Sequence, residues 1–186
     1  LVAQETVPAS HTWQAEYGWD KGVHWQICSV CEGTTSQVAH TVGSDGYCET
    51  CNNPITGSDG VLYWLATDGT HAEVIDYVGT STRVVIADEY EGVPVTHIAQ
   101  NAFENKNITS IILPDSITSI GDSAFSGCSN LESLTIPFVG GSKSATSASS
   151  STLFGYIFGT SSYTGGVATK QYYSSSLLSC DTYYIP

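Results

Sequence analysis

The sequence predicts a mainly β protein with short helical or irregular returns, in which a short repeat solenoid follows a small cysteine-rich module and a β-hairpin. Three observations support this fold class. Two Cys-x-x-Cys pairs lie within residues 1–57, an Asp-Gly turn separates two β-prone segments within residues 61–78, and a motif that begins at Ile98 recurs after 22 residues. A period of this length is typical of solenoids, in which each repeat buries its apolar side chains against its neighbours.

The composition excludes two classes of partner. The 186 residues carry a formal net charge of -13, which repels nucleic acid and anionic lipid headgroups. We also expect no membrane insertion, because no stretch approaches the roughly 18 apolar residues that a transmembrane helix needs. A charged content of only 12% is typical of exported bacterial proteins. We therefore expect an extracellular or cell-surface location, with the export signal outside this sequence.

The N-terminal module is predicted to be held together by a metal ion. It has few aliphatic residues, and a module of this size needs a cross-link, such as a bound metal ion or a disulfide, to be stable. The spacing Cys-x2-Cys-x16-Cys-x2-Cys is that of a zinc ribbon, in which two loops bring four thiolates to one tetrahedral Zn²⁺. The predicted ligands are Cys28, Cys31, Cys48 and Cys51. Disulfides between the two pairs are the alternative, since an exported protein permits them.

Turn-forming residues at 52–60 mark a boundary, so we predict one domain at 1–57 and a second at 58–186. In the second domain, Asp68-Gly69 lies between two short apolar segments. An Asp-Gly dipeptide in this context favours a hairpin, because the turn requires positive φ. The predicted hairpin covers residues 61–78 and caps one end of the solenoid.

The repeat itself is visible as two aligned motifs. Ile98–Phe103 (IAQNAF) recurs as Ile120–Phe125 (IGDSAF), and the segment IILP at 111–114 recurs as LTIP at 134–137. The apolar residues alternate before the proline and are spaced by three after it. Each copy is therefore expected to form one short strand, a proline stop and a curved return.

The repeat is irregular at both ends. A first, partial copy begins near Val84, and a serine-rich loop at 142–151 opens an insertion at about 138–182. The apolar run at 153–158 predicts either a buried hairpin or a helix, and its pattern does not distinguish the two. Residues 183–186 are similar to the start of a further copy.

Residues 84–137 resemble the BspA-type, or Treponema-type, leucine-rich repeats, whose usual form is LxxIxLPxxLxxIGxxAFxxCxxL. Residues 11–51 are similar to a His-Trp-x-x-Cys-x-x-Cys module of the same surface proteins. The resemblance implies a leucine-rich-repeat solenoid in an exported bacterial surface protein with binding or adhesion roles. The similarity to the module also implies a rival ligand set, in which His11, Cys28, Cys31 and His40 close the site without the second cysteine pair. His24 is a further alternate ligand.

A binding face follows from the repeat, because solenoids expose a row of strand side chains. The predicted face consists of Arg83, Val85, Ser110, Ile112, Ser133 and Thr135. We expect it to contact a protein or a glycan on a host or neighbouring cell surface. Two alternatives stay open: the chain is a structural spacer in a larger surface protein, or it is an ancillary domain of a secreted hydrolase.

Catalysis is not expected. The sequence contains no Gly-x-Ser-x-Gly, no His-Glu-x-x-His and no glycine-rich phosphate loop. The tryptophans allow two interpretations, a platform for stacking sugars or the core of the small module. They are Trp13, Trp19, Trp25 and Trp64.

Overall fold

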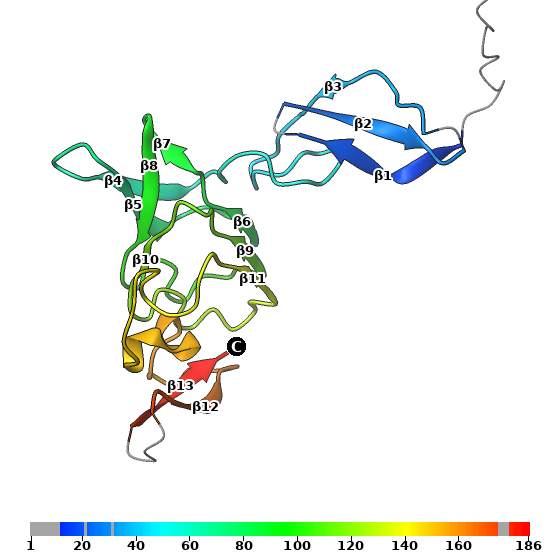
Figure 1. Cartoon of the computed structure of the whole chain (residues 1–186). Coiled ribbons are helices and arrows are strands. Elements are labelled where there is room, and N and C mark those ends of the chain that lie inside the picture. Colours follow the sequence, from blue (N-terminus) through cyan, green and yellow to red (C-terminus); the bar gives the residue numbers. More distant parts are fainter. Residues whose placement is uncertain (1–11, 21, 31, 175–178) are drawn as a thin grey trace, which may run out of the picture. The chain divides into compact units, whose positions relative to one another are not determined.

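The computed structural model describes residues 12–20, 22–30, 32–174 and 179–186. The chain divides into two compact units, shown in Figure 1. Unit 1 takes in the described residues up to Gly43 together with Tyr47–Ile55, and unit 2 consists of Ser44–Gly46 and Thr56–Pro186. Two of the predicted metal ligands, His11 and Cys31, lie outside the described residues.

Unit 1 contains a three-stranded antiparallel sheet with the order β1 (Trp13–Trp19), β2 (Val23–Cys28), β3 (Val38–Ala39). Asp20 shapes the turn between the first two strands, since its carboxylate accepts hydrogen bonds from the amides of Gly22 and Val23 at 2.7 and 2.9 Å. The bonds from Val23 and Gly22 hold the pKa of Asp20 below its ordinary value. The turn thereby fixes the start of β2, where His24 lies.

Strand β1 is irregular in the middle. Trp13 pairs with Cys28 and Tyr17 pairs with Gln26, so three residues of β1 face one residue of β2. Such a bulge bends a strand and changes the direction of its side chains. Beyond the bulge, the Trp25 indole crosses the backbone at Gly18, and a Cβ at this glycine would overlap the ring.

In unit 2, the predicted hairpin is confirmed. Strands β4 (Val61–Leu65) and β5 (Ala72–Tyr77) pair antiparallel. In the connecting turn, the Asp68 carboxylate accepts hydrogen bonds from the amide and hydroxyl of Thr70 at 3.0 and 2.8 Å. Gly69 has φ +68°, a conformation that glycine adopts without strain. The local sequence alone therefore determines this turn.

The repeats build two sheets that contain parallel strands (Figure 1). The first has the order β11 (Ser133–Thr135), β9 (Ser110–Ile112), β6 (Arg83–Val85). In the second, β8 (Val93–Ile98) lies between β5 and β10 (Ser119–Ile120), and the short β7 (Glu89–Tyr90) pairs with β8. Successive copies of the repeat thus contribute neighbouring strands. This arrangement confirms the predicted mainly β leucine-rich-repeat solenoid.

A column of aromatic rings runs through the interior of unit 2. Phe103 and Phe125, from successive copies of the repeat, stack with ring centroids 5.3 Å apart. Tyr77 extends the column at one end, 6.1 Å from Phe103, and Phe158 extends it at the other, 6.3 Å from Phe125. The amide of Phe125 donates to the carbonyl of Ile157, as the amide of Phe103 donates to that of Ala124. Residues 157–158 therefore pack as a third repeat turn, within the range predicted to be an insertion.

Two short 3-10 turns lead up to Phe158, and a β-hairpin follows it. The open prediction for 153–158 is settled in favour of helix, because η2 (Phe154–Ile157) is a 3-10 turn that follows η1 (Ser150–Thr152). Strands β12 (Val167–Tyr172) and β13 (Cys180–Ile185) form an antiparallel hairpin. In the described ranges, no helix has the length and apolar composition to span a bilayer.

Candidate functional site

Four potential metal ligands meet in unit 1. They are His24 on β2, His40 just after β3, and Cys48 and Cys51 in the loop that follows. One ligand atom from each lies within 4.8 Å of the other three. His24 and Cys48 are buried, and His40 and Cys51 are half-buried. Among the described residues, this is the one cluster of three or more His, Cys, Asp or Glu side chains that is close enough to hold a metal ion.

The spacing of these atoms matches a tetrahedral zinc site. The Nδ1 atoms of His24 and His40 are 3.2 Å apart; Cys48 Sγ is 3.8 Å from the first and Cys51 Sγ is 3.7 Å from the second. Zn–N bonds of about 2.05 Å and Zn–S bonds of about 2.3 Å at tetrahedral angles place two nitrogens about 3.3 Å apart and a nitrogen and a sulfur about 3.6 Å apart. The three distances therefore agree with the zinc geometry within about 0.2 Å.

The His40 ring is oriented by a backbone group. Its Nε2 lies 2.8 Å from the carbonyl oxygen of Asp20, and a carbonyl only accepts, so Nε2 carries the proton. Nδ1 then presents its lone pair to the cluster. A second partner of this kind is typical of metal-binding histidines, because it fixes the tautomer and the ring plane. Asp20 was not predicted to be part of the site. The sequence feature that could have indicated it is the Asp-x-Gly turn motif at 20–22.

The loop that carries the two cysteines favours a thiolate. The Thr50 amide donates to Cys48 Sγ at 3.4 Å, and the Asn52 amide donates to the Cys48 carbonyl at 2.9 Å. Burial alone would raise the pKa of the Cys48 thiol, but hydrogen bonds from the Cys51 amide, the His40 side chain and the Thr50 amide together lower it to about 6. Since the thiolate is the metal-binding form, this loop is prepared for a cation.

The described residues next to Cys28 make the same kinds of backbone hydrogen bond as those next to Cys48. The Val30 amide donates to Cys28 Sγ at 3.4 Å, the Glu32 amide donates to the Cys28 carbonyl at 3.0 Å, and the Cys28 amide donates to Gly33. Glu32 has φ 57°, and Asn52, its equivalent in the second loop, has φ 55°. The described residues around Cys28 therefore repeat the hydrogen bonds and the positive φ found around Cys48.

The structure does not bring Cys28 into the cluster. Cys28 is buried at the end of β2, four residues from His24 on the same extended strand. At about 3.3 Å per residue, their Cα atoms are about 13 Å apart. The structure thus groups Cys48 and Cys51 with His24 and His40, whereas the predicted set with histidines used Cys28 and Cys31.

The residues of the predicted binding face lie in register across β6, β9 and β11. One row consists of Arg83, Ser110 and Ser133, and the other of Val85, Ile112 and Thr135. The ladder between these strands is parallel, so each row runs straight across the sheet. The predicted alignment of the repeats is what produces these rows.

Residues 95–158 match the family model of the BspA type Leucine rich repeat region (6 copies). This part of the chain is therefore similar to BspA-type repeats. The match includes Phe158, the last ring of the aromatic column.

Two solved structures are similar to part of the chain. The T. pallidum Leucine Rich Repeat protein is 30% identical, with a TM-score of 0.42 over 44% of this chain and 39% of that chain. A leucine-rich repeat protein from Bacteroides capillosus is 34% identical, with a TM-score of 0.38 over 41% of this chain and 60% of that chain. The chain thus spans less than two thirds of either protein. A comparison with curated proteins gives no match.

One end of the predicted binding face is covered by residues that precede the repeats. Val85 is only 7% exposed. Its amide donates to the Ser58 hydroxyl at 2.7 Å, and the Ser58 amide donates to the Val85 carbonyl at 2.8 Å. Arg83 lies 3.8 Å from the carboxylate of Asp45. The available part of the face therefore lies on β9 and β11.

Proposed function

We propose that this chain is a non-catalytic binding module of a bacterial cell surface, which uses the exposed side of β9 and β11 for adhesion to a protein or a glycan. The aligned rows of short side chains carry this proposal. Ser110, Ser133 and Thr135 offer hydroxyl groups, and Ile112 adds an apolar contact. Such a face suits hydrogen bonding and shape complementarity more than charge pairing.

We further propose that unit 1 holds a structural zinc ion through His24, His40, Cys48 and Cys51. Four protein ligands complete a tetrahedral shell and leave no position for a substrate, which is the arrangement of structural sites. The few buried aliphatic residues of unit 1 support this role. When bound, the ion would supply folding free energy to a module with a small core.

The binding face is tested by substituting residues on it and on the other sheet. We expect Ile112→Asp and Thr135→Asp each to abolish binding of the full chain to a panel of extracellular-matrix proteins and glycans. The matched control is Ile75→Asp, which makes the same change at a 44% exposed position of β5. Binding that survives both face substitutions, or that Ile75→Asp removes equally, would contradict the proposed face. A chain that binds nothing on the panel would favour the alternative function, a structural spacer in a larger surface protein.

A further inference from the structure

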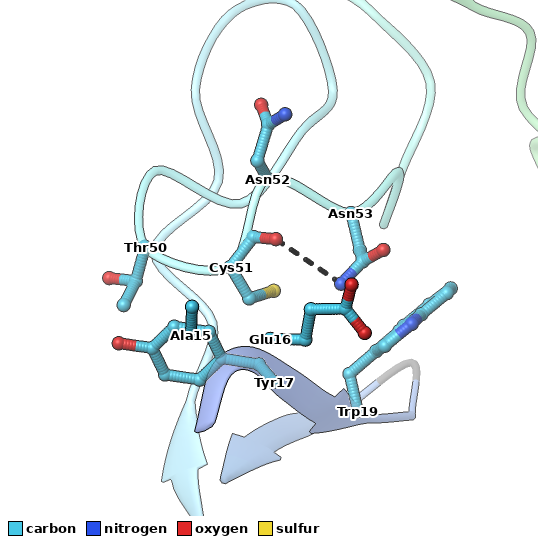
Figure 2. A pocket seen from close by; sticks show the side chains of 8 residues that line it. All are labelled: Ala15, Glu16, Tyr17, Trp19, Thr50, Cys51, Asn52 and Asn53. Atoms are coloured by element: carbon cyan, nitrogen blue, oxygen red, sulfur yellow. Dashed lines mark hydrogen bonds between the residues drawn. The ribbon is translucent and has the colours of Figure 1, made fainter. Parts of the chain in front are cut away.

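A pocket of about 490 Å³ opens in unit 1 beside the metal-site loop (Figure 2). One wall comes from β1 and includes Glu16, Tyr17 and Trp19; the other comes from the loop and includes Thr50 and Asn53. Its volume lies within the range of small-molecule sites. All of these residues belong to unit 1, whereas the repeat face belongs to unit 2.

Of the two aromatic side chains in this wall, Trp19 is exposed and Tyr17 is half-buried. Tyr17 and Trp19 are two residues apart on β1 and therefore point to the same face of the strand. Trp19 is 40% exposed, although an indole buries a large apolar area when it packs in a core. Trp25, by contrast, is half-buried, and its ring lies against the backbone at Gly18. Trp19 is thus left with an apolar surface that faces the pocket.

Polar groups stand beside this surface. Glu16 lies in the bulge of β1, which turns its side chain toward the pocket. The Asn53 side-chain amide donates to the Cys51 carbonyl at 3.3 Å, and this bond fixes its orientation. Figure 2 shows the Glu16 carboxylate and the Asn53 amide next to the Trp19 indole. A carboxylate that accepts hydrogen bonds and an amide are therefore held at the edge of the Trp19 ring.

We infer that this pocket binds a neutral saccharide. The C–H face of a sugar ring stacks on an exposed indole, while its hydroxyl groups bond to carboxylate and amide side chains. The ligand is expected to be uncharged, because Glu16 and the net charge of -13 repel acidic sugars. Trp19 supplies the stacking surface, and Glu16 and Asn53 select the hydroxyl positions.

The test uses the full chain loaded with zinc and a panel of cellobiose, lactose, maltose and diacetylchitobiose. Binding is followed by NMR through the indole N–H signal of Trp19, which a Trp19→Phe variant identifies. We expect at least one disaccharide to shift this signal in a saturable way. Trp19→Ala should weaken that binding by about tenfold or more, as loss of one stacking platform does elsewhere. Glu16→Gln should weaken it several-fold.

The matched control is Trp64→Ala, which removes a 45% exposed indole from unit 2. It should leave the affinity unchanged. Zinc content and the Trp25 indole signal report whether each variant keeps its fold. The inference is overturned if no sugar shifts the Trp19 signal, if tetramethylammonium shifts it and the sugars do not, or if Trp64→Ala weakens binding as much as Trp19→Ala. None of these results would affect the repeat-face substitutions.

Discussion

The Nδ1 atoms of His24 and His40 face each other at 3.2 Å. Two imidazole lone pairs at this distance repel unless a proton or a cation lies between them. We therefore expect His24→Ala to lower zinc affinity by more than the roughly 100-fold that loss of an outer-shell partner costs. Cys28→Ser should leave the zinc content unchanged. Elemental analysis of both variants distinguishes this ligand set from the four-cysteine set. If the four cysteines bind zinc, Cys28→Ser should lose the metal and His24→Ala should keep it.

Removal of the metal should unfold one unit and spare the other. Unit 1 has three strands and few buried aliphatic side chains, whereas the aromatic column stabilises unit 2. Chelation should therefore abolish hydrogen-exchange protection in residues 12–43 and leave residues 95–158 protected. Loss of protection in both ranges would show that unit 2 depends on the metal-bound unit.

The aromatic column should carry much of the stability of the repeat region. Phe125 is fully buried between Phe103 and Phe158. We expect Phe125→Ala to lower the free energy of unfolding by about 3–5 kcal/mol, because it removes stacking and leaves a cavity. Val139→Ala, at an exposed position, should change it by less than about 0.5 kcal/mol. Urea denaturation of the zinc-loaded chain measures both; equal effects would mean that the column is not the stabilising core.

Acid should weaken the contact between the hairpin and the repeats. Lys106 Nζ lies 2.8 Å from the Asp76 carboxylate, and this hydrogen bond lowers the pKa of Asp76. A lowered folded-state pKa adds stability above the unfolded value, and this stability is lost as the pH falls through the folded pKa. Because both side chains are partly exposed, the contribution is at most about 1 kcal/mol. Asp76→Asn should therefore reduce stability slightly at pH 7 and flatten the acid limb of the stability curve. An unchanged acid limb would exclude this pair as a contributor.

Much of the repeat region could be predicted from the sequence. The apolar period places Ile98 against Ile120 and Phe103 against Phe125, since each copy buries the same positions. The Asp68-Gly69 turn was equally predictable, because its hydrogen bonds are local. The third repeat turn, at residues 157–158, could not be predicted. A serine-rich loop shifts Phe158 out of the repeat period, and Ile157 replaces the alanine of the Ala-Phe motif.

The residue types available for a metal site and a binding face could be read from the chain: two cysteine pairs, nearby histidines and a row of strand side chains. Which of these residues meet depends on the three-dimensional fold. The extended strand β2 separates Cys28 from His24. The chain then folds back and brings His40 and Cys51 to His24, at the start of β2. Likewise, Ser58 covers Val85 from 27 residues away. Strand direction and long-range backbone pairing set these contacts, and neither is encoded in local spacing.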